Sequence, residues 1–180
     1  FTIEDAINEA LPGGHLSIRD TVLDWSAADR TLTFRLSEIS LTGEAGNPIA
    51  TVPEMDVQLS VPALLKGMIA ATTVDLYGVT LRLERTAEGG VSFGLQTPAS
   101  DTRPPQLAPS FVGPLVEALA EPPDLGTPLG YFRRLRIRDG KVVYVERVNQ
   151  FELLAEEADI TLRRGARGVY GEMSTSVPYH

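Results

Sequence analysis

Apolar residues recur with the same spacing in three separate stretches of the chain. In each stretch, a first apolar residue is followed by two more, at the fifth and seventh positions after it. The three sets are Ile18, Leu23 and Trp25; Leu76, Leu81 and Leu83; and Ile137, Val142 and Tyr144. We expect each set to belong to a β-hairpin-like unit. Self-similarity of this kind indicates one supersecondary unit that is stacked along an axis and buries its apolar face against its neighbours.

Alternation of apolar and polar residues predicts β-strands over most of the chain. Leu32, Phe34 and Leu36 are the clearest example, with polar or charged residues between them. Val57 and Leu59 alternate in the same way in the next predicted strand. The expected strands cover residues 16–25, 31–41, 49–59, 73–85, 91–95, 131–146, 151–164 and 169–177.

The alternation changes phase in two of these strands. Ile39 has the opposite parity from Leu36, and a bulge near Ser37 and Glu38 would return both apolar residues to one face. A second change of phase occurs at Gly78. In the later strand over 131–146 we expect the chain to turn at Asp139-Gly140.

Helical patterns are few and short. Residues 2–11 are amphipathic, and the pattern ends at Pro12. Residues 62–68 suit one or two helical turns, since proline is favoured at the first helical position. We expect a third short helix over 110–119. Three short helices offer too little surface to cover the apolar side of a sheet of about nine strands.

The distribution of proline divides the chain into three regions. Eight of the 13 prolines lie in residues 96–128, which suits a spacer. Residues 1–95 combine the first helix with about five strands, and residues 129–180 carry the remaining strands. We therefore predict a mainly β (α+β) protein. Its meandering antiparallel twisted sheet forms an open groove and is capped by the short helices.

Composition narrows the classes of function. The formal net charge of −8 combines −10 in residues 1–128 with +2 in residues 129–180, which is a poor match to nucleic acid. The absence of cysteine excludes disulfides and thiolate metal sites. No run approaches the roughly 20 apolar residues of a membrane-spanning helix. The chain starts at Phe1 without a methionine and stops at His180 in a strand-like stretch, so we expect a piece of a longer protein.

The sequence contains no recognisable catalytic motif. His15 and His180 are far apart and lack metal-ligand spacing, and neither a nucleophile elbow nor a phosphate-binding glycine loop is present. Two carboxylates suffice for glycoside hydrolysis, and Asp20, Asp24 and Asp139 lie beside the repeated units. These three are better explained as turn and solvent-facing residues. We predict that the protein is not an enzyme and uses no metal or cofactor.

A basic run follows the spacer. Arg134, Arg136 and Arg138 share one face of a predicted strand, and Leu135 and Ile137 share the other. The simpler interpretation is the solvated side of an amphipathic strand. The alternative is a contact with phosphate headgroups, to which the guanidinium group is geometrically suited.

Residues 23–95 resemble the N-terminal part of AsmA-like proteins, in particular the YhdP-type members with the DUF3971 region. The similar segments are LDWSAADRTLTFRLSEISLTGEAGNPIATVPEMDVQLSVPALLKG over 23–67 and VDLYGVTLRLERTAEGGVSFGL over 74–95. The matching positions are Gly46, Ala50, Pro53, Leu59, Leu64, Leu65 and Gly67, then Leu76, Gly78, Leu81, Leu83, Arg85 and Gly90. Residues 135–162 resemble the next unit of the family, in which Ile160, Leu162 and Arg163 fit a strand motif. The chain departs from the family at Gly78-Val79, where the family has a glycine-proline step.

The resemblance implies an architecture and a function. AsmA-like proteins are anchored in the inner membrane of Gram-negative bacteria by one N-terminal helix, and they extend through the periplasm as a long β-groove. They are similar to bridge-like lipid transfer proteins and are thought to move phospholipids towards the outer membrane. This chain would be the membrane-proximal start of such a bridge, with acyl chains on the apolar strand face and headgroups in water.

The leading hypothesis is therefore a segment of a periplasmic lipid-transport bridge. The expected partners are a phospholipid or other acyl lipid, the inner membrane through a helix outside this chain, and envelope proteins. The expected lipid contacts are Ile18, Leu23, Trp25, Leu32, Phe34, Leu36, Val57, Leu59, Leu76, Leu81, Leu83, Ile137, Val142 and Tyr144. The alternative is a closed-core structural or assembly module of the envelope that binds a protein partner by edge-strand addition.

Overall fold

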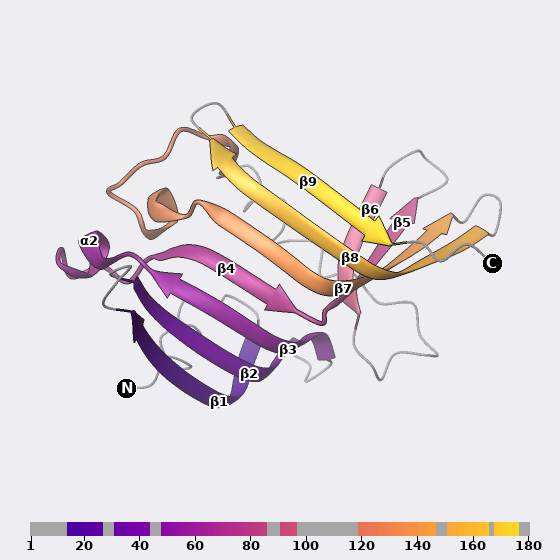
Figure 1. Cartoon of the computed structure of the whole chain (residues 1–180), viewed down its shortest axis with the longest axis horizontal. Helices are drawn as coiled ribbons and strands as arrows, with labels where there is room; N and C mark the ends of the chain where they lie inside the picture. Colours follow the sequence, from indigo (N-terminus) through magenta and orange to yellow (C-terminus); the bar gives the residue numbers. More distant parts are fainter. Residues whose placement is uncertain are drawn as a thin grey trace.

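The computed structural model describes residues 14–26, 31–43, 48–85, 91–96, 119–146, 151–165 and 168–176, and the structural statements below concern these residues. Nine strands form one sheet (Figure 1). They are β1 (Gly14–Ser26), β2 (Thr31–Gly43), β3 (Pro48–Leu59), β4 (Ala71–Tyr77), β5 (Thr80–Arg85), β6 (Val91–Gln96), β7 (Arg134–Glu146), β8 (Phe151–Gly165) and β9 (Gly168–Ser176). The short helical elements are α2 (Val61–Leu64) and η1 (Pro128–Tyr131). The expected fold class, a mainly β protein built on an open sheet, is confirmed.

The sheet combines two antiparallel groups of strands. β1 to β4 pair antiparallel in chain order, and so do β7, β8 and β9. The groups meet where β7 runs parallel to both β4 and β5, while β6 pairs antiparallel with β5. The expected antiparallel meander holds within each group, and the junction between the groups departs from it by pairing in parallel. A parallel neighbour requires a long crossover connection, and residues 97–133 separate β6 from β7.

β4 and β5 replace the single strand that the sequence pattern predicts over 73–85. Gly78 separates them and has a φ of 67°, which a glycine adopts without a steric penalty. Both strands nevertheless pair with β7 in one continuous register, with Leu76 opposite Ile137 and Leu81 opposite Val142. They therefore act together as one interrupted strand along β7.

A change of phase crosses the sheet from strand to strand. Leu36 and Ile39 of β2 are three residues apart, yet both are buried in the same core cluster. Leu76 and Val79 also belong to that cluster and have the same separation. Leu36 pairs with Met55 of β3, which in turn pairs with Leu76, so the changes of phase lie next to one another. Together these positions form a line across the strands, which we call the line of changed phase. The sheet keeps one apolar face on both sides of this line.

Positive φ angles mark the line, at Glu38 (50°) in β2, at Gly78, and at Asp139 (51°) in β7. The predicted change of phase at Ser37 and Glu38 is confirmed, but the bulge expected there is wrong. No residue is inserted, because the register of β2 with β1 and with β3 is the same on both sides of Glu38. The turn predicted at Asp139-Gly140 is wrong, because β7 continues through both residues.

The three apolar sets do not belong to hairpins. The set that begins at Ile18 lies entirely in β1, and the set that begins at Ile137 lies entirely in β7. The set that begins at Leu76 is divided between β4 and β5. The spacing of five residues arises where a strand crosses the line of changed phase, so the prediction of three hairpin-like units is wrong.

The main core cluster joins strands from both antiparallel groups. Its buried members are Leu16, Leu36, Ile39, Val52, Val79 and Ile137. A second cluster of Ala63, Ala70 and Tyr131 connects α2 to η1. Because β7 lies beside β4 and β5, residues before and after the predicted spacer belong to one sheet.

The helix predicted over 62–68 is confirmed as α2 and the turn that follows it. The Oγ of Ser60 caps α2 by accepting a hydrogen bond from the amide of Ala63 at 3.2 Å. The helix expected over 2–11 lies outside the described residues. Most of the spacer over 96–128 also lies outside them, including the helix expected there up to residue 118; residues 119 and 120 are described as helical.

Candidate lipid-binding face

The predicted lipid contacts all occupy positions on one side of the sheet, which we call the apolar face. Across the strands, Trp25 pairs with Leu32 and Leu32 with Leu59, while Leu23 pairs with Phe34 and Phe34 with Val57. Further along, Leu36 is joined through Met55 to Leu76 and Ile137. Leu81 and Leu83 pair with Val142 and Tyr144. The side chain of Leu83 lies outside the described part, so only its backbone position is placed.

The middle of the apolar face is protein core. Leu36 is 1% exposed, and Ile137 and Val142 are also buried. Leu81 is half-buried and packs against two clusters, one around Leu36 and one around Val142. The structure therefore assigns these predicted lipid contacts to the interior, where a ligand would have to displace packed side chains.

The margins of the apolar face are accessible. Leu23 and Trp25 in the second half of β1 are 55% and 53% exposed. At the other margin, Leu153 of β8 and Met173 of β9 are also exposed. Ile18, Leu32, Phe34, Val57, Leu59, Leu76 and Tyr144 are intermediate in exposure. Accessible apolar side chains thus border the core on both flanks of the same face.

Leu153 and Met173 are missing from the predicted contacts. Leu153 pairs with Tyr144, and Met173 pairs with Ile160, so both lie on the apolar face. Two adjacent leucines, Leu153 and Leu154, hide the alternation at this point of the sequence. The pairing of Met173 depends on the register of β8 with β9, which only the assembled sheet determines.

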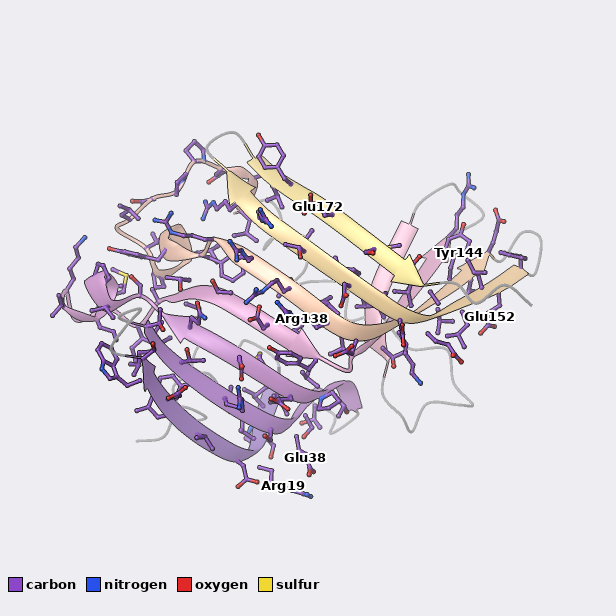
Figure 2. The ribbon with its side chains drawn as sticks, viewed as in Figure 1. Arg19, Glu38, Arg138, Tyr144, Glu152 and Glu172 are labelled. Carbon is purple, nitrogen blue, oxygen red and sulfur yellow. The ribbon has the colours of Figure 1, made fainter. Side chains whose placement is uncertain are left out.

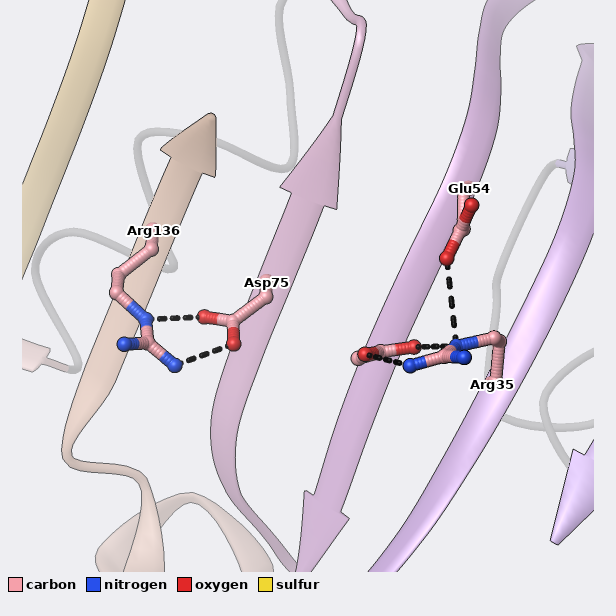
Figure 3. A network of polar contacts seen from close by, with 5 residues as sticks. Arg35, Glu54, Asp75 and Arg136 are labelled. Atoms are coloured by element: carbon pink, nitrogen blue, oxygen red, sulfur yellow. Dashed lines mark hydrogen bonds and ion pairs between the residues drawn. The ribbon is translucent and has the colours of Figure 1, made fainter. Parts of the chain in front are cut away.

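The opposite side of the sheet carries ion pairs and is called the polar face here. Arg35 Nε and Nη2 donate to the Asp56 carboxylate at 2.9 and 3.1 Å, and Glu54 lies 3.3 Å from Arg35 Nε. Arg136 Nε donates to Asp75 Oδ1 at 2.5 Å, and its Nη2 donates to the other carboxylate oxygen. Both arginines therefore make bidentate pairs (Figure 3).

These pairs form one row across four strands. Arg35 pairs in register with Asp56, Asp56 with Asp75, and Asp75 with Arg136. Two buried carboxylates therefore occupy opposed positions, and each is neutralised by an arginine on its outer side. The hydrogen bonds to these carboxylates raise the pKa of Arg35 and of Arg136 above the usual arginine value. The row favours one register of the sheet, because a shifted strand would leave a charge without its partner.

The three arginines predicted to contact headgroups differ in their surroundings. Arg136 is committed to Asp75 and has a side chain only 24% exposed. Arg134 is half-buried and Arg138 is exposed, so these two stay predictions. All three belong to the polar face, so a lipid on the apolar face would reach them only around an edge of the sheet.

The carboxylates considered for catalysis are not brought together. Asp20 and Asp24 are exposed on β1, whereas Asp139 lies on β7, and β2, β3 and β4 stand between the two strands. At the β1 edge, Arg19 and Glu38 form an exposed ion pair at 2.5 Å (Figure 2). Within the described ranges no group of three histidine, cysteine or acidic side chains is arranged to hold a metal ion. In the same part of the chain no helix is long and apolar enough to cross a bilayer.

The site therefore consists of an accessible apolar margin on each flank of a packed core, opposite a face of paired charges. Such a surface offers dispersion and hydrophobic contacts to a ligand. No family model, no curated protein and no solved structure matches this chain.

Proposed function

We propose that the apolar face binds lipid acyl chains, and that the chain is a segment of a periplasmic lipid-transport bridge anchored in the bacterial inner membrane. The observation that carries the proposal is the exposure of Leu23 and Trp25 on one flank, and of Leu153 and Met173 on the other, along a single face. The described sheet is also open, since β1 and β9 each pair on one side only.

Hydrophobic burial would supply the binding energy. Each methylene group that is removed from water contributes about 0.8 kcal/mol to binding. Contact of several methylene groups of an acyl chain with leucine and tryptophan side chains therefore suffices for reversible binding. The same non-directional interaction is available at every point along an apolar strip, so a lipid can shift along it without a high barrier. The headgroup stays in water, where its charge needs no protein partner.

The bridge and its location rest on the resemblance to AsmA-like proteins over 23–95 and 135–162. In that family the membrane anchor precedes the β-groove. The proposal places phospholipid, the inner membrane and further envelope proteins as partners, and it requires no cofactor.

A second candidate is a protein-binding module that accepts a strand at its edge. It is supported by β1, whose 13 residues pair with β2 on one side and with no described strand on the other. An unpaired edge presents backbone amides and carbonyls that a partner strand can bond. Under this hypothesis the exposed residues of β1 would contact a protein instead of a lipid.

Adjacent residues provide a matched test. Val22 and Leu23 are 59% and 55% exposed, but Val22 pairs with Arg35 on the polar face and Leu23 with Phe34 on the apolar face. We expect native mass spectrometry after mild extraction to show phospholipid on the wild type and on Val22→Asp, and much less on Leu23→Asp. Circular dichroism would verify that both variants fold. The proposal would be contradicted if the two variants carried equal amounts of phospholipid, or if the wild type carried none.

The other flank allows the same comparison. Leu153 and Leu154 of β8 are 45% and 48% exposed, with Leu153 opposite Tyr144 and Leu154 opposite Val143. Leu153→Asp should reduce bound lipid more than Leu154→Asp does. If only the β1 pair responds, the lipid occupies one flank of the face rather than both.

A further inference from the structure

The loop that joins α2 to β4, residues 65–70, carries the two most exposed large hydrophobic side chains among the described residues. Leu65 is 85% exposed and Ile69 is 65% exposed. Both project from a stretch in which the neighbouring Ala63 and Ala70 are fully or almost fully buried. The exposure is thus specific to these two side chains and is not shared by the whole segment.

The backbone of this α2 loop is held by several hydrogen bonds. The amides of Lys66 and Met68 donate to the carbonyl of Ala63 at 2.9 and 3.0 Å, and the amide of Ser60 donates to the carbonyl of Ala70 at 2.8 Å. Met68 packs on the cluster formed with Tyr131. A loop fixed in this way cannot turn Leu65 and Ile69 inward without losing these bonds.

The charge of the loop is purely basic. Between residues 61 and 74 the only charged side chain is Lys66. Its Nζ lies 3.0 Å from the hydroxyl of Tyr131 and 5.7 Å from the centre of that ring. The exposed Arg133 is next to this segment, because its amide donates to the carbonyl of Thr72 at 2.8 Å. Cationic and aliphatic groups side by side match the two layers of an anionic membrane surface.

The same end of the sheet also carries acidic residues. Glu121 and Asp124 are exposed in the segment before η1. The carbonyl of Glu121 accepts a hydrogen bond from Arg164, and Asp124 accepts one from the amide of Gly126 at 2.9 Å. They belong to a different segment from the α2 loop, which contains no acidic side chain of its own.

The loop lies where the apolar face ends. The last row of pairing before the loop joins Trp25 to Leu32, Leu32 to Leu59, and Leu59 to Ala71, the first residue of β4. Figure 1 shows α2 beyond the arrowhead of β3, at the end of the sheet where β1 also terminates. Tryptophan is favoured at the boundary between water and acyl chains, and Trp25 is exposed in this row.

We infer that the α2 loop docks on an anionic bilayer surface, with Leu65 and Ile69 inserted at the boundary of headgroups and acyl chains and Lys66 beside the phosphates. Docking in this orientation would bring the Trp25 end of the apolar face to the membrane. That last consequence rests on the proposed function, whereas binding of the loop to a bilayer does not.

Vesicle flotation with the full chain tests the inference. The probes are vesicles of phosphatidylethanolamine with phosphatidylglycerol, and vesicles of phosphatidylcholine alone. We expect the double variant Leu65→Asp, Ile69→Asp to bind the anionic vesicles at least about tenfold more weakly than the wild type. The matched control is Val22→Asp, Leu154→Asp, which changes two exposed side chains on the polar face and should bind as the wild type does. Lys66→Gln should weaken binding to the anionic vesicles about fivefold and change binding to phosphatidylcholine little.

The outcomes separate this inference from the proposed function. A loop variant that no longer floats but still carries phospholipid in the native mass spectrum supports docking by the loop and lipid binding by the face. Equal flotation of the loop variant and the wild type would overturn the docking inference. So would a wild type that floats with neither vesicle, in which case Leu65 and Ile69 would be assigned to a contact with protein.

Discussion

The second half of β1 and the central strands share one apolar face but differ in what surrounds their side chains. Leu23 and Trp25 are more than half exposed, whereas Leu36, Val79 and Ile137 of the neighbouring strands are buried. The residue types are alike on both sides of this comparison. β1 is an edge strand paired only with β2, yet Leu16 in its first half belongs to the core cluster; the accessible margin is the second half, around Leu23 and Trp25.

The same contrast holds on the polar face. The Arg136–Asp75 pair lies between central strands, and Asp75 has a side chain only 7% exposed. The Arg19–Glu38 pair lies between β1 and β2, and both of its side chains are more than half exposed. The Arg136–Asp75 pair is thus enclosed by its neighbours, whereas the Arg19–Glu38 pair is exposed to solvent.

The largest difference in stability between the central strands and the β1 margin should appear when an apolar side chain is truncated. We expect Leu36→Ala to lower the free energy of unfolding by about 2–5 kcal/mol, because it leaves a cavity in the core. Leu23→Ala removes the same atoms from an exposed position and should cost less than about 1 kcal/mol. Urea unfolding followed by circular dichroism measures both. Similar losses for the two variants would mean that the β1 margin is as well packed as the centre.

A smaller difference in stability is expected between breaking the buried ion pair and breaking the exposed one. Asp75→Asn leaves Arg136 without its carboxylate and should lower the free energy of unfolding by about 2 kcal/mol. Glu38→Gln at the exposed pair with Arg19 should cost less than about 1 kcal/mol, and high salt should diminish that cost further. Chemical unfolding at low and high salt measures both effects. A larger loss for Glu38→Gln would reverse the comparison.

The smallest expected effect concerns pH. Tyr77 lies in β4, where burial first, and the charges of Asp56 and Asp75 second, raise its pKa above the usual value near 10. The neutral phenol is thus favoured in the folded state. Its contribution to stability is complete below the unfolded pKa and is lost as pH rises through the folded pKa.

Unfolding at increasing alkaline pH should therefore show a shallower loss of stability for Tyr77→Phe than for the wild type. Tyr170→Phe, at an exposed position on the edge strand β9, is the control and should keep the wild-type loss. If Tyr170→Phe flattens the alkaline profile and Tyr77→Phe does not, the raised pKa of Tyr77, from its burial and its acidic neighbours, is not responsible.

Local pattern alone predicted much of the secondary structure. The alternation of Leu32, Phe34 and Leu36 identified β2, and the irregular backbone at Glu38 followed from the change of parity at Ile39. The proline at the start of α2 marked the only complete α-helix among the described residues. These predictions succeed because the conformation of a strand or a helical turn depends on residues within a few positions of one another.

The local pattern could not predict which strands pair with one another. The spacing that includes Leu76 and Leu81 was interpreted as a hairpin, yet it spans two strands that both pair with β7. Alternation within a strand is the same whether its neighbour is parallel or antiparallel. The parallel contact of β7 depends on where a long connection returns the chain, which no local pattern encodes.

The amino-acid sequence thus determined by itself that the chain is mainly strands and, where the alternation is clear as in β2, which side chains of a strand share a face. Only the tertiary structure decided which members of that face are core, such as Leu36, and which remain accessible, such as Leu23 and Trp25. The reason is that period-two alternation is a property of one strand, whereas burial depends on how many neighbours the assembled sheet places around each side chain.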